Sequence, residues 1–388
     1  MSDSWIDIKR NRRIIQRKEK PIFLERFSNN ALISEITNKY RIIAHKKLQR
    51  KNILLNFLEI FKLLIVINLF SQTFAEKKNF NSIECRFSNI TLKINGYGTK
   101  MVFSNNFKED LYPNMVYING KKQLEVNHYY YFNQTENNVE LVWNMSIHLT
   151  EYMFFQCSDI TEIDLSNFNA SLVKNMTRMF GECSSLISIN LINFDTSQVT
   201  MMNRMFESCT SLKSLDLSYF NTSQATDMDY LFADCSSLNS LDLSHFDTSH
   251  SRQIDGMFSN CVKLTSLNLS NFNTSNVTRM NCMFENCISL TSLDLSNFDT
   301  SKVTNLYSMF SGCSSLKYLN LSSFVTSLAI NFSNMFYECS NLTSLDLSNF
   351  DTSNVIKMNN MFDGCINLQY IILIYNNTYY SNKNIFLN

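Results

Sequence analysis

Apolar residues recur along most of the chain in one 26-residue pattern. In the copy that begins at Cys287, apolar and polar residues alternate over 293–296, and this period of two predicts a short strand. The sequence Asp-Thr-Ser at 299–301 is typical of a turn or of a helix start. Apolar residues then recur at steps of three and four through 303–313, which predicts a helix of two to three turns.

One cysteine in each repeat marks this period. Stacked repeats place every strand beside its copy, so we expect a solenoid of about nine coils, each with a strand and a short helix, and therefore an α/β fold. Helices are wider than the roughly 4.8 Å spacing of strands, which predicts a parallel sheet on the concave side. The cysteines of this series, called the Cys ladder below, are Cys157, Cys183, Cys209, Cys235, Cys261, Cys287, Cys313, Cys339 and Cys365.

The solenoid is expected to cover residues 137–375, and the segments on either side differ from it. Residues 76–136 contain two alternating stretches and the Asn-Gly pairs at Asn95 and Asn119, which predict strands joined by hairpin turns. We interpret 76–136 as a small β-rich cap on the first coil. Residues 376–388 form a short C-terminal tail, which leaves the last coil weakly capped and available for self-association.

The N-terminal part of the chain holds a basic tail (1–52) and an apolar segment (53–75). Residues 1–51 carry 14 Lys/Arg against 5 Asp/Glu. Three interpretations of 53–75 are open: a membrane-spanning helix with the basic side in the cytoplasm, a cleaved signal segment, and an amphipathic soluble helix. The first two place residues 76–388 at the cell surface or secreted, and the membrane-spanning helix would make the chain a single-pass membrane protein.

Composition limits the classes of function. Lys+Arg and Asp+Glu are 34 each, so a globally basic nucleic-acid-binding protein is not expected. Only 7 Gly and 2 Pro are present against 31 Phe and 18 Met, which excludes collagen-like and Pro-rich chains. The high Phe and Met content follows from the repeated words MFxxC and SNF.

The repeat MFxxCxSLxSLDLSNFDTSxVTxMxxMF resembles that of the BspA-like leucine-rich-repeat surface proteins. The similarity covers about residues 137–375, over half of the chain. It implies a leucine-rich-repeat-like solenoid displayed at a cell surface, and adhesion is proposed for some members. It implies no particular site residue, because the shared motif is the core of the fold.

The Cys ladder is in phase with Met, Phe and Leu, which predicts buried small side chains. Disulfides between neighbouring coils are an alternative, and metal binding is a third, although no CxxC or HxxxH pair accompanies the ladder. No cofactor is expected. The five His show no recurring arrangement with Ser and Asp, and no GxSxG or HExxH motif is present, so we do not expect an enzyme.

A polar column follows the predicted strands, seven residues after each ladder cysteine. Period two points this column away from the Leu core, so it forms the candidate binding face, with flanking Ser residues. Such a face suits a protein or glycan ligand at the cell surface, and a solvated hydrogen-bonded ladder is the alternative. A structural or antigenic coat protein, or an intracellular repeat scaffold, are the competing functions. The column contains Asp164, Asn190, Asp216, Asp242, Asn268, Asp294, Asn320 and Asp346.

Overall fold

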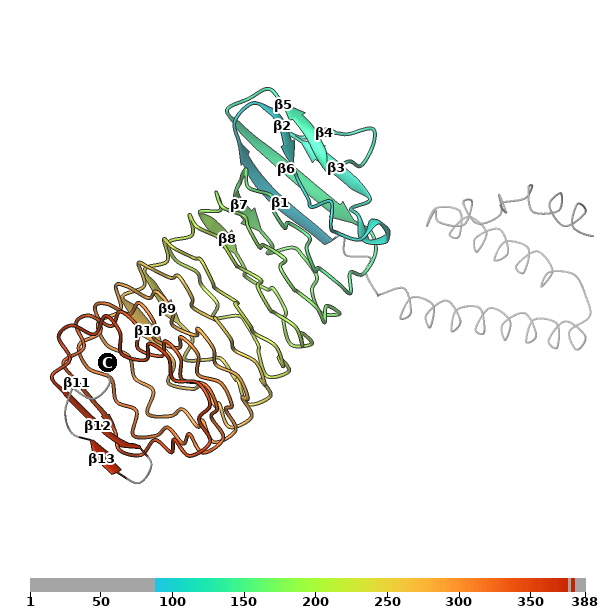
Figure 1. The fold of residues 1–388 in the computed structure, drawn as a ribbon. Helices are drawn as coiled ribbons and strands as arrows, with labels where there is room; N and C mark the ends of the chain where they lie inside the picture. The colour runs from blue at the N-terminus through green and yellow to red at the C-terminus, as the bar shows by residue number, and fades with distance from the viewer. Residues whose placement is uncertain (1–87, 376–377, 381–388) are drawn as a thin grey trace, which may run out of the picture. The chain divides into compact units, whose positions relative to one another are not determined.

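The computed structural model describes residues 88–375 and 378–380, which belong to one compact unit. The predicted basic tail, the apolar segment 53–75, the first part of the cap and most of the C-terminal tail lie outside the described residues. Figure 1 shows a β-rich cap followed by a stack of coils.

The cap is an antiparallel arrangement of short strands. Its central pair, β1 and β6, is in register from Ser88↔Trp143 to Asn95↔Glu136. β1 buries alternate residues, and the indole Nε1 of Trp143 donates a 2.8 Å hydrogen bond to the Leu111 carbonyl. The elements are β1 (Ser88–Asn95), β2 (Gly98–Met101), η1 (Glu109–Leu111), β3 (Met115–Ile118), β4 (Lys121–Lys122), β5 (Tyr129–Phe132) and β6 (Glu136–Trp143).

The expected hairpin turn at Asn119 is present between β3 and β4, whereas the one expected at Asn95 is wrong, because β1 pairs with β6 and β7 (Ile160–Asp164) and β2 pairs with β5. Asn119 and Gly120 both have positive φ, 49° and 75°, as a two-residue type I′ turn requires. β6 extends across residue 137, where the first coil was expected to begin, and the chain enters the coils after Trp143. The cap also joins the coils directly, because β1 pairs antiparallel with β7.

Each coil has at most one strand, and some coils have none. Pairs separated by one repeat are parallel, as between Leu241 of β9 and Leu267 of β10. The coils at 214–216, 292–294 and 318–320 carry no assigned strand, so the parallel sheet is interrupted. The remaining strands are β8 (Ser188–Asn190), β9 (Ser240–Asp242), β10 (Ser266–Asn268), β11 (Ser344–Leu347), β12 (Tyr370–Tyr375) and β13 (Thr378–Tyr380), the last two forming an antiparallel hairpin.

The short helices expected after each turn are absent, and the α/β prediction is wrong in this respect. Within residues 88–375 and 378–380, the only helix is the three-residue η1. In every coil the expected helix is replaced by turns with a left-handed residue five positions and one position before the ladder cysteine. These residues are Tyr152, Arg178, Arg204, Tyr230, Gly256, Cys282, Ser308, Asn334 and Asn360, and Gln156, Glu182, Ser208, Asp234, Asn260, Asn286, Gly312, Glu338 and Gly364.

The physical reason is that these backbone groups bond to the next coil instead of to their own turn. Phe180 N–H donates to the Met205 carbonyl at 2.9 Å, and Glu182 N–H donates to the Glu207 carbonyl at 2.7 Å. Intervening N–H groups close short turns, as from Met179 to Met176. A left-handed residue costs about 1 kcal/mol, which the cross-coil bonds offset.

These turn segments hold the stack together more continuously than the strands do. Short parallel pairings link every coil from Leu149 to Lys357, each one repeat from the next. Because no helices widen this side, the reason for expecting a concave sheet no longer applies. We therefore name the surface formed by the outward residues five and seven positions after each ladder cysteine the strand face, without assigning it a curvature.

Two columns of stacked phenylalanines fill the core. Rings three residues before each ladder cysteine stack from Phe154 to Phe362 with centroids 5.4–5.9 Å apart. A second column, from Phe168 to Phe350, follows the strands, and five of its seven neighbouring pairs have centroids 6.1–6.4 Å apart. Such pairs contribute roughly 0.5–1.5 kcal/mol each beyond the burial of their area.

The Thr of the Asp-Thr-Ser turn is also buried and is fully bonded. Thr248 Oγ1 donates to the Asn273 carbonyl at 3.0 Å and accepts from Asn273 N–H at 2.8 Å. The preceding Asp accepts from the N–H two residues on, as Asp247 Oδ1 does from Ser249 at 2.9 Å. The prediction of a turn at this motif is confirmed, and no helix follows it.

Candidate functional site

The candidate binding column lies on the surface, as its spacing indicated. Seven of its eight residues are exposed, and Asn190 is half-buried. The side chains are outward because the residue between the two outward positions, such as Leu241 or Leu345, is directed into the core. The column therefore forms an ordered row of carboxylates and amides on the strand face.

Each residue of this column also holds a local turn. Asp242 Oδ1 accepts from Ser244 N–H at 3.0 Å, and the same i to i+2 bond occurs at all eight positions. These bonds lower the pKa of Asp216, Asp242 and Asp294, so the three carboxylates stay ionised. The Oδ1 atom of each side chain is thus used in the fold.

Neighbouring polar residues also bond between coils. Asn190 Nδ2 donates to Asp164 Oδ1 at 3.0 Å. An amide between carboxylates removes part of their repulsion. The arrangement therefore has the character of a hydrogen-bonded ladder as well as that of an accessible surface.

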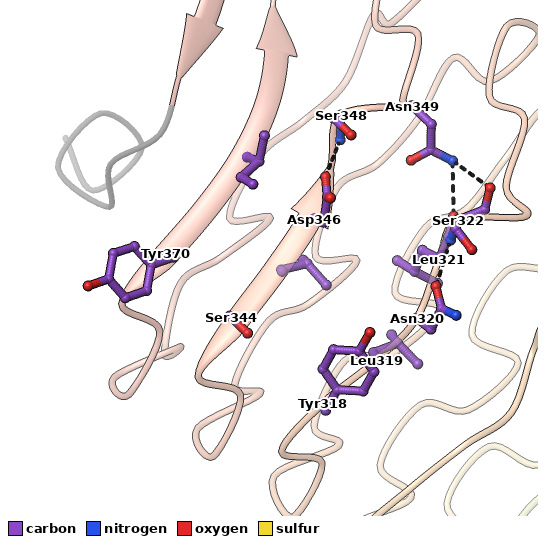
Figure 2. A pocket seen from close by; sticks show the side chains of 12 residues that line it. Tyr318, Leu319, Asn320, Leu321, Ser322, Ser344, Asp346, Ser348, Asn349 and Tyr370 are labelled. Atoms are coloured by element: carbon purple, nitrogen blue, oxygen red, sulfur yellow. Dashed lines mark hydrogen bonds between the residues drawn. The ribbon is translucent and has the colours of Figure 1, made fainter.

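The strand face contains a hollow between the coils that carry Tyr318 and Tyr370 (Figure 2). Its volume is about 320 Å³. Tyr318 is 65% exposed and Tyr370 is 64% exposed, and Ser344 lies between them on the intervening coil. We call this hollow the Tyr notch; its lining includes Asn320, Ser344, Asp346 and Asn349.

The Tyr notch could not be located from the repeat pattern alone, although its two aromatic residues are visible in the sequence. Both stand five residues after a ladder cysteine, where six other coils have Ser. The hollow forms beside the 318–320 segment, where the strand pairing is interrupted. A Tyr at a Ser position was therefore the available signal.

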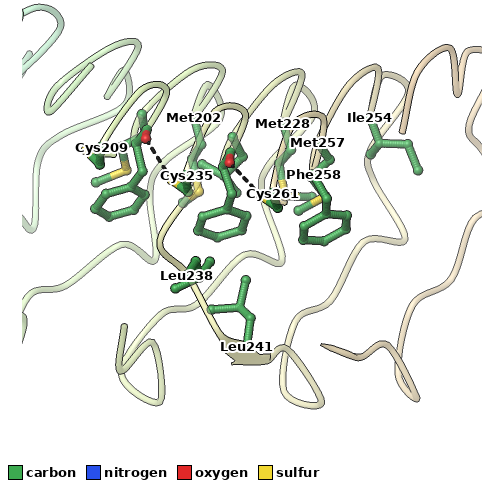
Figure 3. Close-up of a cluster of buried hydrophobic side chains, with 14 of the residues drawn as sticks. Met202, Cys209, Met228, Cys235, Leu238, Leu241, Ile254, Met257, Phe258 and Cys261 are labelled. Atoms are coloured by element: carbon green, nitrogen blue, oxygen red, sulfur yellow. Dashed lines mark hydrogen bonds between the residues drawn. The ribbon is translucent and has the colours of Figure 1, made fainter. Parts of the chain in front are cut away.

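The Cys ladder is buried, and the nine thiols are free. From Cys183 onward, each Sγ donates to the carbonyl of a Phe in the preceding coil, at 2.9–3.3 Å. Figure 3 shows two of these bonds, made by Cys235 and Cys261 among Met and Leu side chains. This geometry agrees with the predicted buried ladder, and the ladder contains no disulfide.

Burial also lowers the reactivity of the ladder thiols other than Cys365, whose own pKa is lowered by a hydrogen bond with the Cys339 side chain. Desolvation raises the pKa of Cys235 and of Cys313 to about 12. Cys282, outside the ladder, is half-buried, and burial followed by the charge of Glu285 raises its pKa to about 12. Thiolate nucleophiles are therefore not available at these positions near neutral pH.

A cluster of charged residues on the turn segments was not anticipated from the sequence. Asp255 is 1% exposed; its Oδ2 lies 2.5 Å from Arg279 Nη2, an ion pair outside hydrogen-bond geometry. Asp229 Oδ1 accepts from Asp255 N–H at 2.7 Å. Burial, followed by the charge of Asp255, raises the pKa of Asp229 to about 7. Asp229 and Asp255 occupy the same repeat position in neighbouring coils, but most other coils carry no carboxylate there, so the 26-residue pattern alone does not predict the cluster.

The described histidines have structural contacts. A ring nitrogen of His245 lies 2.6 Å from the Leu217 carbonyl oxygen. In other coils, Ser323 or Asn349 at the same repeat position bonds to the equivalent Leu carbonyl. His128 bonds to the Tyr112 hydroxyl within the cap. Across 88–375 and 378–380, no group of three or more His, Cys, Asp or Glu is arranged to hold a metal ion.

Together the tandem coils and their 26-residue pairings define a repeat protein. Residues 127–187, 184–267 and 253–375 match the family described as "Mycoplasma protein of unknown function, DUF285". These matches run from 127 to 375, more than half of the chain, and the chain belongs to this family. No curated protein and no solved structure matches it.

The part of the chain that the structure describes contains no helix with the length and apolar character needed to cross a bilayer. The segment 53–75, for which a span or signal is predicted, lies outside that part. Its interpretation stays a prediction from sequence.

Proposed function

We propose that this chain is a non-enzymatic cell-surface repeat protein whose strand face binds a protein or glycan ligand. The observation that carries the proposal is the row of eight Asp and Asn side chains, each fixed by the same turn bond. Fixed side chains lose little conformational entropy on binding, so weak contacts can add up along the row. The surface location is drawn from the sequence of 53–75 and its basic flank, which we propose to be an anchor or a signal.

A screen of the full chain against matrix proteins and glycans tests the binding function. In the triple variant Asp216→Ser, Asp242→Ser, Asp294→Ser, we expect affinity for the ligand found to fall by about tenfold or more, which corresponds to roughly 1.4 kcal/mol. The matched control replaces Asp195, Asp247 and Asp299 with Ser. It removes the same charge and the same kind of turn bond outside the strand face, and should leave binding unchanged.

The location has its own test. Protease added to intact cells should remove residues of the coils, and protection of the coils would contradict a surface position. Sequencing the N-terminus of the mature protein then distinguishes cleavage before Glu76 from a retained anchor.

A structural coat protein without a dedicated ligand is the second candidate. It is favoured by the Asn190–Asp164 bond, which uses outward groups within the protein itself. A screen that finds no ligand whose binding the triple variant weakens more than its matched control does would favour this candidate.

A further inference from the structure

The outward column five residues after each ladder cysteine changes character toward the C-terminal coils. It carries Ser188, Ser214, Ser240, Ser266 and Ser292, and then Tyr318, Ser344 and Tyr370. The two tyrosines are therefore separated by one coil, which carries the small side chain of Ser344 at this position. This replacement pattern creates a slot bounded by aromatic side chains.

The slot has the dimensions of one small ring. Strands are about 4.8 Å apart, so positions two coils apart are about 10 Å apart. Van der Waals contact needs about 3.5–4.0 Å between carbon atoms on each side. A single saturated six-membered ring fits such a space. The hollow of about 320 Å³ is also near the lower end of the roughly 300–1,000 Å³ typical of small-molecule sites.

The lining offers both hydrogen-bond donors and acceptors. Asn320 Oδ1 accepts from Ser322 N–H, and Asp346 Oδ1 accepts from Ser348 N–H (Figure 2). Within the described residues, Asn320 Nδ2 and Asp346 Oδ2 make no further hydrogen bond. Asn320 Nδ2 is thus a free donor and Asp346 Oδ2 a free acceptor, and the Ser344 hydroxyl can donate or accept.

We propose that the Tyr notch is a carbohydrate subsite that holds one neutral hexopyranose unit of a glycan. The C–H faces of the sugar pack on Tyr318 and Tyr370, while Asn320, Ser344 and Asp346 bond to neighbouring hydroxyls. A sugar hydroxyl both donates and accepts, which matches this mixed set. Asp346 is the only charged residue of the lining, so a neutral sugar is preferred to an acidic one. The inference rests on the proposed binding function and specifies its ligand.

A glycan array probed with the full chain tests the proposal. We expect binding to neutral glycans and a loss of at least tenfold in Tyr318→Ser and in Tyr370→Ser. Serine is the residue that other coils carry at this position, so these variants keep the fold. Asn320→Asp should also weaken binding, because a donor becomes a second carboxylate.

A transplanted notch supplies the converse experiment. Ser266→Tyr places a tyrosine across Ser292 from Tyr318, with Asn268 and Asp294 at the repeat positions of Asn320 and Asp346. We expect the number of neutral-sugar sites to rise from one to two, as measured by ligand-detected NMR titration. The variant Ser240→Tyr is the control and should add no site.

The outcomes separate this inference from the wider function. Unchanged glycan binding in both tyrosine variants, or no binding to any neutral glycan, overturns the carbohydrate subsite. If a ligand is still lost in the Asp216, Asp242 and Asp294 triple variant, the strand face remains a binding surface. If a basic peptide competes at the Tyr notch and no sugar does, the carbohydrate assignment is wrong.

Discussion

The thiol of Cys235 donates a 3.1 Å hydrogen bond to the carbonyl oxygen of Phe206, in the preceding coil. The same carbonyl accepts from the N–H of Cys209 at 3.2 Å. A cysteine side chain is small enough for the core and still supplies a donor, so one residue type serves packing and polar satisfaction together. This relationship repeats along the stack and accounts for the constant position of the Cys ladder.

Thiol labelling should therefore be slow in the folded protein. In a Cys85→Ser background at neutral pH, we expect the ladder cysteines other than Cys365 to react only when the coils open, because these thiols are buried and their thiolates are disfavoured. Cys365 should react first, since it is 8% exposed against 0–1% for the others. Mass spectrometry after labelling with and without denaturant measures the order. Fast labelling of all nine thiols in the native protein would show that the ladder is not buried.

Replacing a left-handed residue by glycine distinguishes the observed turns from helices. Ser208 has φ of 58°, so Ser208→Gly should leave the free energy of unfolding unchanged or raise it by up to about 1 kcal/mol. In a helix the same change would lower it by roughly 0.5 kcal/mol. Ser211→Gly, slightly further along at a position without positive φ, is the control and should destabilise the protein. Denaturant unfolding measures both, and a destabilised Ser208→Gly would argue for a helix.

Gly256 should not tolerate a side chain. Its φ is 55°, and an added Cβ would lie 2.2 Å from the Tyr230 ring. We expect Gly256→Ala to lower the free energy of unfolding by about 2 kcal/mol or more, from strain and from the clash. Gly98→Ala has positive φ and open space, so about 1 kcal/mol is expected there. Equal costs for the two would contradict the close approach of Tyr230, and a Tyr230→Ser background should recover part of the Gly256→Ala loss.

The Asp229 carboxyl should make stability depend on pH. Its folded pKa of about 7 lies above the ordinary 3.8, so the folded state binds this proton more tightly than the unfolded state. The contribution of the group to stability is thus fully present below pH 3.8 and is lost as pH rises toward about 7. Asp229→Asn, which keeps the Oδ1 acceptor for Asp255 N–H, should be more stable than the wild type at pH 7 and should flatten this dependence.

Asp294→Asn is the control for that measurement, because the Asp294 carboxyl makes stability depend on pH in the opposite direction. The N–H of Ser296 lowers the pKa of Asp294, so this contribution is present above the unfolded pKa and is lost as pH falls. Thermal unfolding between pH 3 and 8 measures both variants. An Asp229→Asn curve parallel to that of the wild type would show that Asp229 titrates normally in the folded protein.

Much of the core follows from the repeat. The period places Phe180, Phe206 and their copies, Leu293 and the ladder cysteines inside, and all of these are buried. The candidate column is also outside, as period two requires. By contrast, the period places Asp229 beside Asp255, but it does not predict a carboxylate at this position or the burial of Asp255, because most other coils carry Asn, Ser, Thr or Tyr there.

By itself, the sequence determined the 26-residue period, the buried and outward columns, and the turns at Asp-Thr-Ser. The tertiary structure alone decided the conformation of the Met-Phe segment and the position of the Tyr notch. Apolar residues spaced three and four apart are compatible with a helix and with stacked turns. The two structures differ in the carbonyl that accepts the hydrogen bond from Phe180 N–H. That acceptor is the Met205 carbonyl, which belongs to the next coil and comes within reach only when the coils are stacked.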